Sequence, residues 1–237
     1  MKKEFENIRN HFIEKNIDVP KHPILLSIEQ RAKLSKMLMG RINKIRELDE
    51  NSDIALCVKS ILETIYCALE VCVLMDSVPN VELVCDIYSD RAVDGKFQYD
   101  EFGKIIPRFG WTGVYHDNIS NHNKTSHSDI ESDYEIIKSY HERFDLPVGN
   151  EKKVLSIEKV KNRTFSLYSL TEDFLNSIFI MWDNEYLSKI IFELLEILVE
   201  MGINPKEIYP IVEKYMMNGK NVDCYDEIKE ALIEKTM

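Results

Sequence analysis

The amino-acid sequence predicts an all-α protein, built as two tandem antiparallel helical bundles that form a pseudo-dimer, with a small hairpin or loop insertion between them. The main observation is an internal repeat, because residues 5–29 and 134–158 both begin with a helical stretch, break near a proline and end on Leu-Ser-Ile-Glu. The match continues where Met75–Pro79 lines up with Met201–Pro205. Glycine is scarce, at 8 of 237 residues, which favours helices over turn-rich β structure. A repeated helical unit predicts that any function lies where the two copies meet.

The positions of the helices are predicted from apolar residues at helical spacing and from the residues that start and stop helices. Phe5, Ile8 and Phe12 form the apolar stripe of a first helix, which ends before Pro20. Ser27 followed by Gln30 is a capping-box pattern that opens the second helix. The third helix is the most apolar, so we expect it to be the most buried. The predicted helices cover residues 2–16, 27–49, 52–75, 79–88, 130–145, 156–180, 184–201, 205–217 and 223–236.

The segment between the two copies has a different character. Two glycine turns, Asp94-Gly95 and Phe102-Gly103, flank short aromatic stretches and predict a small hairpin. The stretch that follows is polar and is typical of a linker. The expected organisation is a first repeat with its tail at residues 1–117, a linker at 118–133 and a second repeat at 134–237.

Composition limits the possible partners and the compartment. A net charge of −11 argues against a nucleic-acid backbone as the main partner, because phosphate binding needs clustered cations. The five cysteines form no Cys-x-x-Cys pair and mostly lie in apolar runs, which indicates buried, reduced thiols. The first residues have no apolar signal-peptide core, and the most apolar run carries Lys59, Glu63 and Glu70. We therefore expect a cytoplasmic protein with no membrane partner, present as a monomer or a homodimer.

Three segments resemble the MazG-like, all-α nucleoside triphosphate pyrophosphohydrolases. Tyr140–Val148 looks like the F-H-E-K-F-G-like string and Pro-containing connector of that superfamily. Leu198–Pro205 looks like the end of its third helix and the start of its fourth, and Asp94–Ile106 looks like the tail of some members. The resemblance covers most of both copies. It implies hydrolysis of the α–β phosphate bond of a nucleoside triphosphate, with Mg²⁺ held by carboxylates on two neighbouring helices.

The chain departs from this family at the residues that carry the chemistry. In the first copy the expected acidic motif falls on Met39–Lys44, where basic residues replace the acids. In the second copy the nearest match is Glu172 and Asp173, which are the predicted catalytic residues. The predicted Mg²⁺ ligands are Glu63, Glu172, Asp173, Glu193 and Glu196. The alternative for Glu193 and Glu196 is a solvated helix face. The alternatives for Glu63 are a lone carboxylate at an exposed edge and an ion-pair role with Arg41 or Lys44.

A basic group on the second predicted helix gives another candidate site. Arg41 and Lys44 can neutralise a bound phosphate where the family uses a metal, because the arginine fork accepts phosphate oxygens in pairs. Lys96 and Lys104 join them if the tail resemblance holds. The predicted substrate-binding residues are therefore Arg41, Lys44, Lys96 and Lys104, and an ordinary basic helix face is the alternative.

Two functions follow as hypotheses. The first is a nucleotide-binding protein of the MazG-like type, which either hydrolyses a nucleoside triphosphate with Mg²⁺ or is a catalytically inactive pseudoenzyme. The second is an acidic helical interaction protein that binds or inhibits a protein partner, which the net charge of −11 and the incomplete motif favour. Magnesium-dependent release of pyrophosphate distinguishes the two hypotheses.

Overall fold

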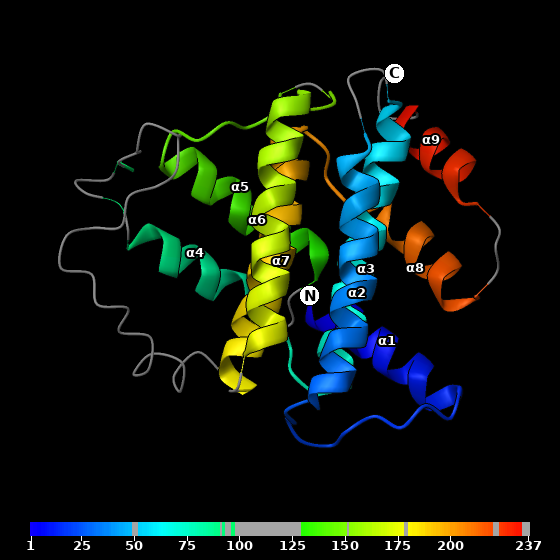
Figure 1. The fold of residues 1–237 in the computed structure, drawn as a ribbon. Coiled ribbons are helices and arrows are strands. Elements are labelled where there is room, and N and C mark those ends of the chain that lie inside the picture. Colours follow the sequence, from blue (N-terminus) through cyan, green and yellow to red (C-terminus); the bar gives the residue numbers. More distant parts are fainter. Residues whose placement is uncertain are drawn as a thin grey trace.

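The computed structural model describes residues 1–48, 52–90, 92, 96–97, 129–150, 152–177, 180–219 and 223–233. Every element in these residues is an α-helix, which confirms the all-α prediction (Figure 1). The predicted hairpin, apart from a few residues around Phe97, and the predicted linker before Asp129 lie outside the described residues. The helices are α1 (Lys2–Glu14), α2 (Ile28–Arg46), α3 (Ile54–Met75), α4 (Val81–Ser89), α5 (Ile130–Arg143), α6 (Ile157–Asn176), α7 (Ile180–Glu200), α8 (Tyr209–Met217) and α9 (Tyr225–Ile233).

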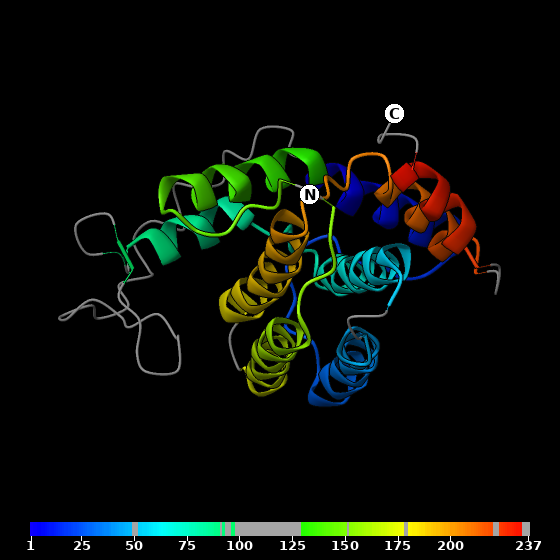
Figure 2. The same ribbon diagram turned by 90° about the horizontal axis from the view of Figure 1, so that it is seen from above.

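Four helices form the centre of the molecule. α2 packs against α6 and α3, while α7 packs against α6 and α3. α1, α8 and α9 lie against α3, and α4 and α5 lie against α7, on opposite sides of the central four (Figures 1 and 2). α4 therefore packs on helices that follow the insertion, and α8 packs on a helix that precedes it. The two halves of the chain are interleaved.

α3 and α7 are surrounded because their sequences are apolar on nearly every face. α3 is the most apolar helix, and most of its side chains are buried, including Tyr66 and the thiols of Cys57, Cys67 and Cys72. All five cysteines are buried and free, as predicted. Among the helices that the structure describes, none has both the length and the apolar character needed to cross a bilayer.

The ends of α2 and α6 follow from their capping residues. The Gln30 backbone N–H donates to Ser27 Oγ at 3.2 Å, and Gln30 Oε1 accepts from the Ser27 N–H at 2.9 Å, so the predicted capping box is confirmed. Ser156 caps α6 through its hydroxyl, which accepts from the Lys159 N–H at 3.4 Å. The predicted helix at 156–180 extends too far. α6 ends at Asn176 because Ser177 takes an extended backbone conformation, with φ −64° and ψ 144°.

The backbone follows the same local path at corresponding places in the two halves. Asn16 and Asp145 both have positive φ, at 57° and 54°, and so do Asp76 and Gly202, at 52° and 70°. The Ile24 N–H donates to Met75 O at 3.1 Å, and the Lys153 N–H donates to Met201 O at 3.2 Å. These positions match in the register set by the two Leu-Ser-Ile-Glu segments and the two Met–Pro segments.

Candidate functional site

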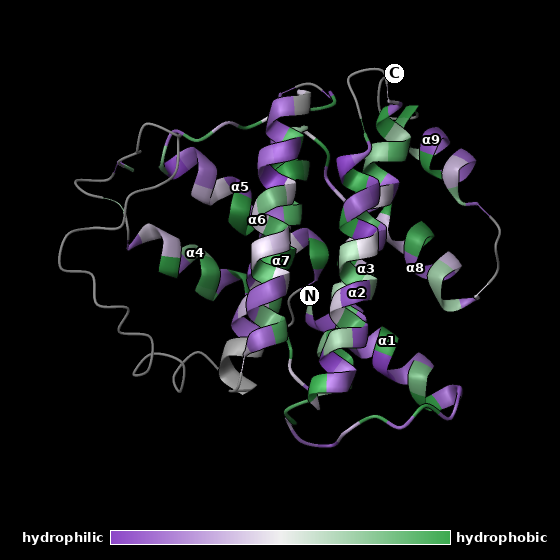
Figure 3. Ribbon diagram, viewed as in Figure 1, coloured by the Kyte–Doolittle hydropathy of each residue, from purple (hydrophilic) through white to green (hydrophobic). Residues whose placement is uncertain are grey.

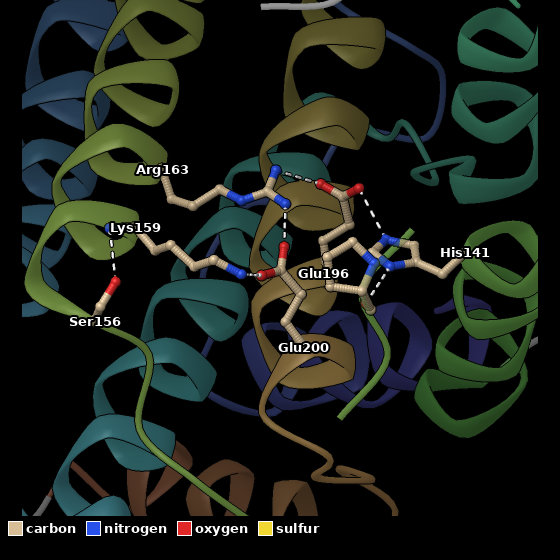
Figure 4. Close-up of polar contacts among 7 residues, drawn as sticks. His141, Ser156, Lys159, Arg163, Glu196 and Glu200 are labelled. Carbon is tan, nitrogen blue, oxygen red and sulfur yellow. Dashed lines mark hydrogen bonds and ion pairs between the residues drawn. The ribbon is translucent and has the colours of Figure 1, made fainter. Parts of the chain in front are cut away.

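A set of polar side chains fills the contact between α6 and α7. Three buried carboxylates on α7 recur every three or four residues, so they share one face of that helix. α6 presents two cations and a hydroxyl at similar spacing, and α5 adds a buried imidazole. We call these residues the α6–α7 network: His141, Lys159, Arg163, Ser166, Glu193, Glu196 and Glu200. Figure 4 shows the contacts among His141, Lys159, Arg163, Glu196 and Glu200.

Arg163 is shared between two carboxylates of the network. Its Nη1 donates to Glu196 Oε2 at 2.6 Å, and its Nη2 donates to Glu200 Oε1. The second Glu200 oxygen accepts from Lys159 Nζ at 3.1 Å. Glu200 therefore pairs with two cations from successive turns of α6, and one oxygen of Glu196 pairs with Arg163 of the same helix (Figure 4).

His141 completes the network from α5. Its Nε2 lies 3.0 Å from Glu196 Oε1, and its Nδ1 lies 2.7 Å from the carbonyl oxygen of Pro147. The ring is 1% exposed, so its contacts with Pro147 and Glu196 fix its position between α5 and α7.

The charges of the network balance one another. Burial by itself raises the pKa of Glu196, but Arg163 and His141 outweigh burial and bring the pKa below its ordinary value. Burial lowers the pKa of Arg163, and Glu196 and Glu200 outweigh that effect and raise it. Each ion is stabilised by its partners, so removing one partner leaves another charge buried and unpaired.

Glu193 is the exception in the network. Burial raises its pKa to about 7, while the hydrogen bond from Ser166 opposes the shift and the charge of Glu196 adds to it. Its Oε1 accepts from Ser166 Oγ, and its buried Oε2 has no hydrogen-bond partner in the part of the chain that the structure describes. Glu193 therefore takes up a proton near neutral pH, unlike Glu196 beside it.

The predicted magnesium ligands do not form one cluster. Glu193 and Glu196 lie in the α6–α7 network, Glu172 and Asp173 are exposed on α6, and Glu63 lies on α3. Within the described residues, no group of three or more His, Cys, Asp or Glu side chains is arranged to hold a metal ion. Both oxygens of Glu196 already accept hydrogen bonds from cations. The residues as arranged do not fit Mg²⁺, which needs free oxygen ligands at near-octahedral geometry.

The alternatives for these carboxylates have opposite outcomes. The solvated helix face is wrong for Glu193 and Glu196, which are 6% and 7% exposed, because α5 and α6 cover that face of α7. The ion-pair role for Glu63 is confirmed, since Glu63 Oε2 pairs with Arg41 Nη1, and Lys59 Nζ lies 3.9 Å from its other oxygen.

The predicted substrate-binding residues are also distributed over the molecule. Arg41 is engaged by Glu63, and Lys44 is exposed on α2. Lys96 precedes Phe97, whose ring lies 4.8 Å from that of Phe144 beside α5. α2 is one of the four central helices, whereas α5 lies outside them against α7 (Figures 1 and 2). Lys104 lies outside the described residues.

The sequence interpretation missed His141, Lys159, Arg163 and Glu200 as one group. Lys159 and Arg163 are four residues apart on α6, and Glu196 and Glu200 are four residues apart on α7. Matching i, i+4 pairs of opposite charge on neighbouring helices are the pattern that would have indicated the pairing. The comparisons with protein-family models, curated proteins and solved structures found no match for this chain.

Proposed function

We propose that this chain is a helical binding protein that acts through a protein partner and not as a magnesium-dependent hydrolase. The observation that carries the proposal is the sharing of Arg163 between Glu196 and Glu200. Binding Mg²⁺ at these carboxylates requires breaking both ion pairs, which leaves the Arg163 charge without its partners. The inward carboxylates of α7 therefore serve the packing of α5, α6 and α7.

We also infer that α1–α4 and α5–α8 are two copies of one unit, arranged as a pseudo-dimer. The matched positive-φ residues and the matched hydrogen bonds support this inference. The packing of α4 on α7 and of α8 on α3 supports it as well, since each short helix lies on the other half. The MazG-like resemblance then describes the ancestral plan, from which both copies have lost the complete acidic motif.

Nucleotide binding is the second candidate function. Two observations favour it: Glu172 and Asp173 are exposed together on α6, and Lys44 is exposed on α2, which packs beside α6. A magnesium–nucleotide complex bound from solvent uses carboxylates that are free of internal ion pairs. This candidate retains Glu172 and Asp173 as catalytic residues and Lys44 as a phosphate-binding residue.

An assay of pyrophosphate release separates the two candidates. The purified chain is incubated with each common nucleoside triphosphate, with and without Mg²⁺, and we expect no release above the background of a Glu172→Gln/Asp173→Asn variant. A thermal-shift scan of the same mixtures gives an independent result. A nucleotide present at about a hundred times its dissociation constant stabilises a fold by about 2.7 kcal/mol, and we expect no such shift.

The matched control is Glu158→Gln/Asp226→Asn, which removes one exposed carboxylate from the first turn of α6 and one from α9. Magnesium-dependent release that the Glu172→Gln/Asp173→Asn variant abolishes and the control keeps would overturn the binding-protein proposal. It would establish the nucleotide candidate instead.

A further inference from the structure

The first half of the chain exposes a run of large apolar side chains, most of which have polar or partly buried counterparts in the second half. Five such residues lie between the end of α1 and the first turn of α2, and they are 40% to 75% exposed. They follow the connector on the outside of the central helices, where Figure 3 shows hydrophobic stretches. We call them the apolar edge: Ile13, Ile17, Ile24, Leu25 and Ile28.

The fold itself does not require this exposure. In the register of the repeat, Ile13 and Ile24 correspond to Glu142 and Lys153, which are polar and exposed. Ile17 and Leu25 correspond to Leu146 and Val154, which are partly buried against the core. The backbone path is the same, since Asn16 and Asp145 share a positive φ and the connectors share the hydrogen bond to the end of the long helix.

Unpaired cations continue the edge along α2. Lys33, Lys36 and Lys44 are exposed, and none has an ion-pair partner within the described part of the chain. The corresponding positions of α6 are Asn162, Phe165 and Asp173, so this cationic stripe also belongs to the first half alone. An apolar surface beside unpaired lysines complements a segment that carries both apolar and acidic side chains.

We propose that the apolar edge and the cationic stripe form the docking surface for an acidic amphipathic helix of another protein. Exposed apolar surface of this kind marks an interaction site in a soluble chain, and the lysines select acidic over basic segments. A helix is favoured over an anionic bilayer, because an extended bilayer meets a broad face of a chain whose net charge is −11, whereas a helix contacts only the edge and the lysines beside it. This inference rests on the binding function proposed above and names its surface and its class of partner.

The test uses the full chain and a fluorescein-labelled synthetic helical peptide with leucine on one face and glutamate on the other. The central variant is Ile13→Glu/Ile24→Lys, which places the residues of the second half on the same backbone and leaves the net charge unchanged. We expect peptide affinity, measured by fluorescence anisotropy, to fall by about tenfold or more, with an unchanged melting temperature. Lys33→Glu/Lys36→Glu is expected to weaken binding similarly, while the matched control Lys153→Glu/Lys161→Glu keeps wild-type affinity.

Several outcomes would overturn the proposal. Unchanged peptide affinity in Ile13→Glu/Ile24→Lys would exclude the apolar edge as the binding surface. An equal loss of affinity in the Lys153→Glu/Lys161→Glu control would show that the lysine effect depends only on net charge. Edge-dependent binding to vesicles containing phosphatidylserine, without peptide binding, would assign the surface to lipid. A wild-type dimer that the edge variant dissolves would assign it to a second copy. None of these results requires nucleotide turnover, so failure of the edge is distinguishable from failure of the binding-protein proposal.

Discussion

The long central helices of the two halves carry a glutamate at the same place in the repeat, in contrasting surroundings. Glu196 on α7 meets Arg163 and His141, and these cations hold its pKa below the ordinary value. For Glu70 on α3, burial raises the pKa to about 7, against the opposing effects of Arg41 and Cys67.

The residues around the two glutamates explain the contrast. The positions that correspond to His141, Arg163 and Glu200 are Phe12, Leu34 and Leu74 in the first half. At these three positions the first half packs with apolar side chains, although Arg41 and Glu63 pair elsewhere between α2 and α3, and the second half uses a balanced set of ions. A buried ion set depends on all of its members, because each charge is costly to bury alone. Apolar packing tolerates single changes better.

The largest expected effect comes from breaking the ionic half. Arg163→Ala leaves Glu196 and Glu200 buried without their shared cation, and we expect the free energy of unfolding to fall by about 3 kcal/mol. Urea denaturation followed by circular dichroism measures this change. The matched change in the apolar half is Leu34→Ala, where a partly buried side chain is lost and the expected cost is smaller.

The replacement His141→Phe/Arg163→Leu/Glu196→Gln/Glu200→Leu sharpens the comparison, because it removes the charges of all four residues and places the residues of the first half at three of the positions. Since a buried ion set can be replaced as a whole by neutral residues at little cost, we expect this quadruple variant to be more stable than Arg163→Ala, which leaves Glu196 and Glu200 without their shared cation. A quadruple variant less stable than Arg163→Ala would mean that neutral side chains cannot replace the ionic network.

Glycine substitutions give an intermediate effect of opposite sign in the two halves. A Cβ on Gly149 would lie 2.3 Å from the backbone nitrogen of Gly202, while a Cβ on Gly40 meets nothing within 4 Å. We expect Gly149→Ala to lower the free energy of unfolding by about 1–3 kcal/mol through overpacking. Gly40→Ala, at an exposed position in the middle of α2, is expected to raise it by about 0.5–1 kcal/mol. Thermal unfolding of both variants checks the signs.

The pH dependence of stability compares the two kinds of glutamate directly. Burial raises the pKa of Glu70 and of Glu193 to about 7, so the stability that each contributes is complete below its unfolded value, about 4.3, and is lost as pH rises through 7. Glu196 has a lowered pKa, so its contribution is lost instead as pH falls through that value. We expect Glu70→Gln and Glu193→Gln to flatten the decline in urea midpoint between about pH 5 and pH 7. An unchanged slope in both variants would show that neither group titrates in that range.

The sequence was sufficient for the fold class and for local features that depend on neighbours in the chain. The order of the helices, the Ser27–Gln30 capping box and the buried cysteines all follow from helical periodicity and capping chemistry. The Arg41–Glu63 pair was foreseen as an alternative because the two residues lie on consecutive helices.

The α6–α7 network was not foreseen, because its partners come from three helices. His141 and Glu196 are 55 residues apart in the chain, and periodicity does not tell which face of α7 meets α5 or α6. Glu193 and Glu196 were expected on a solvated face because the apolar residues beside each glutamate in the sequence were expected to face the core in their place. α7 is buried on nearly all sides, so its glutamates had no solvent face to occupy.

The most direct test of the account is a titration of the wild-type chain with Mg²⁺, followed by the urea midpoint of unfolding. We predict no change in the midpoint beyond that of a Glu193→Gln/Glu196→Gln variant, because His141 and Arg163 already engage both oxygens of Glu196 and Ser166 engages one oxygen of Glu193. A saturable increase in the wild-type midpoint that the variant lacks would contradict it, and would show that the α6–α7 network is a metal site.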